Sequence, residues 1–180
     1  MKPKFPQVMK SVAALTGVAT MLFSALYCVF AYDWLLSTAI TFGTTFYHFG
    51  MRLLVGALVP PVQGTSPWFR PRKWEAALYR LLHVKAWKRH LPTYDPRQFS
   101  LAENTLAQVI RNMCGAEIVH EVIMLCSFLT LLAIPIFGSW PVFLTTSVLA
   151  ALFDSLFVMA QRYNRPRLER IYQKQEARSL

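Results

Sequence analysis

Residues 115–129 read GAEIVHEVIMLCSFL, and this stretch decides how the rest of the chain is interpreted. Two glutamates and a histidine, Glu117, His120 and Glu121, stand directly before an apolar run. Such groups are costly to hold away from water, and inside proteins they are normally paired. Their position at the mouth of an apolar segment predicts a polar working site within a membrane.

The apolar run belongs to one of two long apolar stretches, residues 11–59 and 113–159. Hydrophobic residues make up 54% of the 180 residues and charged residues only 16%, where a soluble domain carries about 25% charged residues. Each stretch is long enough for two passes of about 20 residues, and a backbone in lipid must satisfy its own hydrogen bonds, which favours helices. We therefore predict an all-α integral membrane protein with four transmembrane helices in a single domain, residues 1–180. The predicted spans are residues 11–31, 34–59, 114–137 and 140–160.

Lysine and arginine predict the orientation in the membrane. Of the 19, three precede the first span, nine lie between the second and third spans, six follow the fourth, and Arg52 alone lies within a span. With four passes, all the basic residues outside the spans fall on one side, which the positive-inside rule assigns to the cytoplasm. We expect both termini, the central segment 60–112 and the basic tail 161–180 to be cytoplasmic.

The net charge of +10 also suits a nucleic-acid-binding protein. Here, however, the basic residues flank spans and are mixed with tryptophans, which fits a bilayer with anionic lipids better, so no nucleic-acid partner is expected. Within the central segment, Trp74 and several leucines recur at near-helical spacing and predict an interfacial amphipathic helix over residues 72–90. Ser100 and Glu103 have the spacing of a capping box, which predicts that the helix leading into the third span starts there.

Two features of the apolar stretches admit other interpretations. The three cysteines, Cys28, Cys114 and Cys126, are odd in number and irregularly spaced, which predicts neither a disulfide framework nor a zinc site. The N-terminus has the basic start of a signal peptide, but its apolar core is about 20 residues long where signal peptides have about 7–15. We expect the first span to be retained.

The ionisable residues of the spans fall on shared helix faces. Glu117 lies three residues from His120 and four from Glu121. At about 1.5 Å per residue, the polar groups of the second, third and fourth spans lie at similar depths in the inner half of the bilayer. They are therefore predicted to meet in one cluster, which consists of His48, Arg52, Glu117, His120, Glu121 and Asp154.

A glutamate beside a histidine orients the imidazole and stabilises its protonated form, as a general base in acyl transfer requires. We predict His120 as that base and Glu117 as its orienting partner. Three alternatives remain: a purely structural set of polar contacts between helices, the proton relay of a small transporter or partner subunit, and an intramembrane metal site. Glu-x-x-His with further acids matches oxygen and nitrogen ligand sets, but no metal is favoured.

The stretch QRYNRPRL, residues 161–168, stands where the fourth span leaves the membrane. The arginine fork suits phosphate or carboxylate recognition, although a basic cluster at a span end also serves to stop translocation. Because a proline disfavours helix at the residue before it, we expect the helix to break at Pro166. The predicted donor-binding or acceptor-binding residues are Gln161, Arg162, Asn164, Arg165 and Arg167.

Three motifs carry a resemblance to a known family: QRYNRPRL at residues 161–168, Ala116-Glu117-x-x-His120 and Val84-Lys85-x-Trp87-Lys88. In these motifs the chain resembles the glycosyl-4,4'-diaponeurosporenoate acyltransferases, small membrane enzymes of bacterial carotenoid synthesis. The resemblance implies transfer of a fatty acyl group from an acyl thioester to a sugar hydroxyl of a membrane glycolipid. It implies no further cofactor and a place in the bacterial cell membrane. Acceptors other than a glycosylated carotenoid, including other glycolipids and lipid alcohols, fit the same reading.

Overall fold

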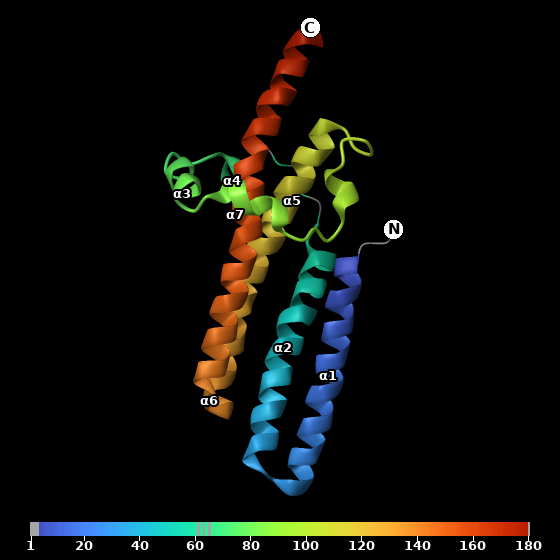
Figure 1. Cartoon of the computed structure of the whole chain (residues 1–180), viewed down its shortest axis with the longest axis vertical. Coiled ribbons are helices and arrows are strands. Elements are labelled where there is room, and N and C mark those ends of the chain that lie inside the picture. Colours follow the sequence, from blue (N-terminus) through green and yellow to red (C-terminus); the bar gives the residue numbers. More distant parts are fainter. Residues whose placement is uncertain (1–3, 61, 63, 65, 180) are drawn as a thin grey trace. The chain divides into compact units, whose positions relative to one another are not determined.

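The computed structural model describes residues 4–60, 62, 64 and 66–179, which are all helix and loop (Figure 1). The chain divides into two compact units. Unit 1 comprises Met1–Leu58 and Val122–Phe153, and unit 2 comprises Val59–Glu121 and Asp154–Leu180. Two helices, α5 (Leu106–Ser127) and α7 (Trp140–Ser179), each have residues in both units. A single membrane domain over the whole chain stays a prediction.

Unit 1 is built on a helical hairpin. Helices α1 (Lys4–Phe30) and α2 (Asp33–Leu58) pack along one another, and the turn between them places Ala31 in the left-handed region at a φ of 53°. The rings of Phe23 and Phe42 stack between the two helices with their centroids 5.7 Å apart. Apolar and aromatic contacts of this kind hold the hairpin together.

The remainder of unit 1 contains the end of α5, η4 (Phe128–Ala133), α6 (Ile134–Phe137) and the first part of α7. The Tyr47 hydroxyl on α2 donates to the Cys126 carbonyl at 2.7 Å, and the buried hydroxyls of Thr130 and Ser147 lie 2.7 Å apart. These polar groups satisfy one another away from water, which an apolar environment requires.

Three helices among the described residues are long and apolar enough to cross a membrane: Phe5–Phe30, Leu106–Phe137 and Trp140–Arg178. Large apolar side chains on them face outward; Leu15 and Leu125, for example, are 71% and 74% exposed. Surfaces of this kind suit lipid, and the chain is a multi-pass membrane protein. The predicted second span is helical over the 26 residues of α2, but its passage through the membrane, and so the count of four, stays a prediction.

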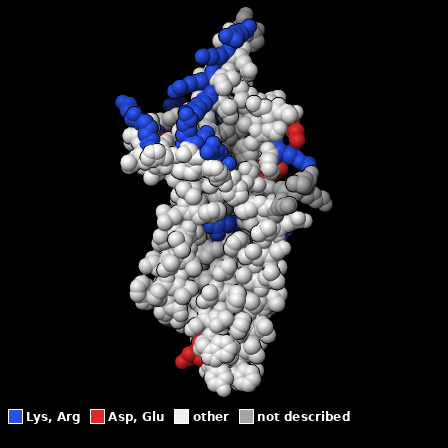
Figure 2. All heavy atoms as spheres, viewed as in Figure 1, with Lys and Arg blue, Asp and Glu red and all other residues white. Residues whose placement is uncertain are grey.

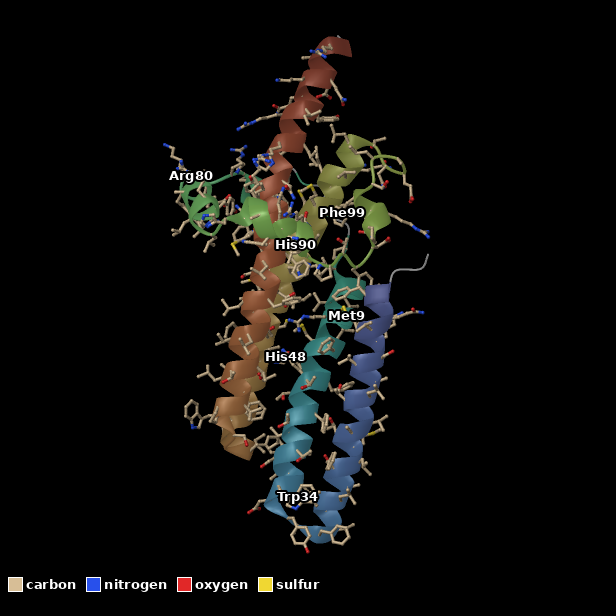
Figure 3. The ribbon with its side chains drawn as sticks, viewed as in Figure 1. Met9, Trp34, His48, Arg80, His90 and Phe99 are labelled. Atoms are coloured by element: carbon tan, nitrogen blue, oxygen red, sulfur yellow. The ribbon has the colours of Figure 1, made fainter. Side chains whose placement is uncertain are left out.

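Unit 2 holds the central segment, which contains η1 (Pro67–Phe69), α3 (Glu75–Leu81), α4 (Val84–Trp87), η2 (Lys88–His90) and η3 (Pro96–Phe99). The predicted helix over residues 72–90 is thus helical but divided, because His83 adopts a left-handed φ of 51° between α3 and α4. Figure 2 shows Lys and Arg side chains gathered over unit 2, around α3, α4 and the C-terminal part of α7. Arg80 on α3 points away from its ribbon (Figure 3).

The predicted helix start at Ser100 is wrong. The Ser100 hydroxyl accepts from the Ala102 N–H at 3.3 Å in a turn, and α5 begins only at Leu106. The capping box lies at Thr105, whose hydroxyl accepts from the Gln108 N–H at 3.2 Å while the Gln108 side chain accepts from the Thr105 N–H at 2.7 Å. Ser100 and Thr105 are both candidates for the N-cap of α5. Thr105 is the N-cap, because the side chain of Gln108 bonds back to its backbone N–H.

The predicted break at Pro166 is also wrong, since α7 continues through this residue to Ser179. A proline inside a helix removes one backbone hydrogen bond and crowds the carbonyl four residues earlier, which here belongs to Arg162. The side chains of Arg162 and Arg165 are fixed to other parts of unit 2, as described below. These contacts hold the helix on the N-terminal side of the proline.

Candidate functional site

Glu117 on α5 is fully buried in unit 2 and binds two arginines of α7. One carboxylate oxygen accepts from Arg162 Nη1 at 2.6 Å, and the other accepts from Arg165 Nη1. Arg165 is only 1% exposed. Removing either charge would leave the other buried without its partner, which is strongly destabilising.

Arg162 uses all of its hydrogen-bonding capacity within the protein. A guanidinium has five N–H donors. Nε donates to Glu75 at 2.9 Å and Nη2 lies 2.7 Å from the same oxygen, while Nη1 binds Glu117. The remaining donors reach the carbonyls of Trp68 and Arg70, each at 3.4 Å. All of the donors of Arg162 are thus engaged within the protein, and its predicted binding role stays a prediction.

Arg165 is also held within unit 2, through both of its terminal nitrogens. Its Nη2 donates to the Phe69 carbonyl, its guanidinium lies 5.0 Å from the centroid of the Phe69 ring, and its Nε is 3.5 Å from Glu169. The two arginines thus bind the carbonyls of three successive residues, Trp68 and Phe69 in η1 and Arg70 at its C-cap, and fix that turn. We call Glu75, Glu117, Arg162 and Arg165 the buried clamp; its two carboxylates balance its two guanidiniums.

His120 pairs with Asp154 rather than with Glu117. Its Nδ1 lies 2.9 Å from Asp154 Oδ1, with Asp154 1% exposed and the His120 side chain 22% exposed. The imidazole also stacks on the Phe157 ring, with centroids 4.5 Å apart. Because Nδ1 is bound to the carboxylate, Nε2 is the ring nitrogen that remains to accept a proton.

Glu117 therefore does not orient His120 as predicted. The two residues share a helix face, but the arginines of α7 capture the glutamate and an aspartate of α7 takes its place at the imidazole. A catalytic role for either residue stays a prediction.

Glu121 has a third partner. One of its carboxylate oxygens accepts from the Trp68 indole N–H at 2.9 Å. Both residues, with Trp74, Tyr79 and Arg162 among the others, line a cavity of about 210 Å³ in unit 2. Burial, followed by the Glu75 carboxylate, raises the pKa of Tyr79 to about 12, so its hydroxyl stays protonated at neutral pH.

The other predicted binding residues lie along α7. Asn164 accepts from the ammonium group of Lys88, and the charges of Lys88 and Arg167 lie 4.6 and 4.5 Å from the centroid of the Tyr163 ring. Burial, and then the charges of Arg167 and Lys85, lower the pKa of Lys88. Gln161 is half-buried. Asn164 and Arg167 thus belong to a basic cluster that sequence reasoning had not linked to Lys88.

His48 and Arg52 belong to unit 1. His48 is buried midway along α2 (Figure 3), and its ring packs edge-on against Tyr47. Arg52 donates to the His48 carbonyl at 2.8 Å and to the Ala150 carbonyl at 3.3 Å, so it joins α2 to α7 within this unit. A shared cluster of these two residues with the acids of unit 2 stays a prediction.

Metal ligands do not gather in the described part of the chain: no group of three or more His, Cys, Asp or Glu side chains comes together there. The three cysteines are free thiols.

Residues 65–174, more than half of the chain, match the family model described as glycosyl-4,4'-diaponeurosporenoate acyltransferase. The match includes the whole buried clamp, the His120–Asp154 pair and the cavity, and it leaves α1 and α2 outside. No match was found among curated proteins or among solved structures. The chain is thus a membrane acyltransferase that belongs to the glycosyl-4,4'-diaponeurosporenoate acyltransferase family.

Proposed function

We propose that the chain transfers a fatty acyl group from an acyl thioester to a hydroxyl of a glycosylated carotenoid, or of another membrane glycolipid or lipid alcohol, with His120 as general base. Family membership supplies the reaction class. The observation that supports the base is the 2.9 Å contact between His120 Nδ1 and the buried Asp154. A buried carboxylate in this position fixes the imidazole and stabilises its protonated form.

In the proposed step, the acceptor oxygen attacks the thioester carbonyl while its proton moves to His120 Nε2. A C–O bond forms, the C–S bond breaks, and the departing thiolate takes the proton from the imidazolium. Asp154 offsets the positive charge of the ring during the step. In this proposal Glu117 does not contact the reacting atoms. It is a positioning residue that holds η1 through Arg162 and Arg165 of the buried clamp.

The basic cluster is the proposed place for the anionic part of the donor or for the acceptor headgroup. Lys88 and Arg167 carry the charge there, Asn164 contributes a polar side chain, and Gln161 extends the same helix. Arg162 and Arg165 are not assigned to this role, because both guanidiniums are buried and bind the carboxylate of Glu117.

We further propose four passes, with α2 as a span, the central segment and both termini in the cytoplasm, and the reaction at the cytoplasmic leaflet. The distribution of lysine and arginine supports this orientation. In a protein whose own cysteines are replaced by alanine, Tyr94→Cys is expected to react with a membrane-impermeant maleimide only in inside-out vesicles. Ser139→Cys is expected to react only in right-side-out vesicles. The same sidedness for both positions would contradict the orientation.

The reaction itself is tested with purified protein in nanodiscs, supplied with an isotopically labelled acyl thioester and the glycosyl ester of 4,4'-diaponeurosporenoic acid. We expect mass spectrometry to find the labelled acyl chain on a sugar hydroxyl. Labelled free fatty acid alone, or no consumption of thioester with any glycosylated lipid, would contradict the proposed function.

A further inference from the structure

The cavity in unit 2 combines aromatic side chains with carboxylates. Trp68, Trp74 and Tyr79 line it together with Glu75 and Glu121. Trp68 and Trp74 are 50% and 56% exposed, so much of each indole is open to a ligand. Ligand sites of this composition bind through apolar faces and use a few polar groups to fix orientation.

Trp68 is held more firmly than a residue that only anchors the protein at the membrane surface. Its indole N–H donates to Glu121 and its carbonyl accepts from Arg162. The guanidinium of Arg72 lies 5.5 Å from the centroid of its ring. The buried clamp holds the next two residues of the turn by their carbonyls as well. The indole is therefore preorganised, which lowers the entropy lost on binding.

The charges favour a neutral ligand rich in hydroxyl groups. The lining carries two carboxylates, Glu75 and Glu121, and two guanidiniums, Arg72 and Arg162, so its charges balance. Glu75 is paired with Arg162, whose donors are engaged within the protein, and Arg72 lies over the Trp68 ring. A carboxylate has lone pairs for roughly four hydrogen bonds, and Trp68 supplies one donor to Glu121. The glutamate is thus able to accept from further hydroxyl groups.

We propose that this cavity binds the sugar ring of the acceptor, with its C–H face against the indoles of Trp68 and Trp74 and its hydroxyls donating to Glu121. The C–H groups of a sugar carry partial positive charge, which suits the negative face of an indole. Hydroxyl groups form strong, charge-assisted hydrogen bonds to a carboxylate. This inference rests on the proposed function, since it assigns the sugar of that reaction to a site.

Two residues that line the cavity directly follow, in the sequence, residues that contact each other at the proposed base. Glu121 follows His120 on α5, Val158 follows Phe157 on α7, and Glu121 and Val158 both line the cavity. His120 and Phe157 stack on each other. The proposed sugar site and the proposed base thus occupy neighbouring positions along α5 and α7.

Binding is tested in the His120→Ala protein, so that no turnover interferes. Nanodiscs receive either the glycosyl ester of 4,4'-diaponeurosporenoic acid or the free acid, and tryptophan fluorescence is recorded. We expect a saturable change with the glycosyl ester that the free acid does not produce. The change should disappear in a protein that also carries Trp68→Phe and Trp74→Phe, and persist with Trp34→Phe, a control whose indole is 61% exposed in unit 1. Equal changes for ester and free acid, or a change that survives the double substitution, would overturn the inference.

Kinetics give the second test. In otherwise unaltered protein, Glu121→Gln and Trp74→Phe are expected to raise the KM for the glycosyl acceptor by about tenfold, the loss expected for a hydrogen bond to a charged group or an aromatic contact. The value of kcat should change far less, as it should in the matched control Glu103→Gln. A fall in kcat at unchanged KM would contradict the sugar site. The assignment of His120 as the base is tested separately: if the His120→Ala protein retains acyl-transfer activity, that assignment is wrong, whatever the result for the sugar site.

Discussion

Replacing Glu117 with alanine is expected to lower the free energy of unfolding by about 3–5 kcal/mol. The substitution leaves Arg162 and Arg165 buried, at 8% and 1% exposed, without the carboxylate that they share. It also removes the support that fixes their donors on the carbonyls of Trp68, Phe69 and Arg70. The measurement is the midpoint of denaturation of the purified protein in mild detergent, and Glu103→Ala, at an exposed position, is the matched control.

A double substitution tests whether the loss of stability in Glu117→Ala comes from the unpaired buried charge or from the lost side-chain volume. Replacing a buried ion pair by apolar residues of similar size is often neutral or stabilising. We expect Glu117→Leu combined with Arg165→Met to recover much of the stability lost in Glu117→Ala. If Glu117→Ala unfolds at the same midpoint as the wild type, the buried clamp does not stabilise unit 2.

The helices could be predicted from the sequence because hydrophobic length alone constrains them. Long apolar stretches have few ways to satisfy their backbone hydrogen bonds in lipid, and the helix is the simplest of them. The ends of helices depend on single side chains instead. Ser100 and Thr105 offer the same capping chemistry, and only the reciprocal contact of Gln108 distinguishes them.

The sequence predicted which residues share a helix face, but it could not predict their partners. Spacing along one helix predicts which side chains share a face, and His120 and Glu117 do so. Their partners come from α7: Asp154 lies 34 residues from His120, and Arg162 lies 45 residues from Glu117. Helix periodicity carries no information about contacts over such separations. The contacts of Trp68 with Glu121 and of Arg162 with Glu117 therefore had no signal in the sequence.

Replacing His120 with alanine is expected to lower the rate of acyl transfer by about 10²–10⁴-fold, the usual contribution of a general base. The acceptor hydroxyl would then have no side chain placed to take its proton. Asp154→Asn should also lower the rate, because the imidazole loses the negative charge that stabilises its protonated form. Neither substitution touches the buried clamp.

His90 provides the matched control, since it is an exposed histidine in the central segment of the same unit. His90→Ala should retain the wild-type rate. A similar loss in this variant would indicate a general disturbance of unit 2 instead of a specific role for His120.

The most direct test is the initial rate at which nanodisc-embedded wild-type, His120→Ala, Asp154→Asn and His90→Ala proteins form acylated glycosyl ester from equal amounts of acyl thioester. We predict wild-type rates for His90→Ala, a reduced rate for Asp154→Asn and almost no product for His120→Ala. A folded His120→Ala protein that forms product at the wild-type rate would contradict acyl transfer by the histidine–aspartate pair.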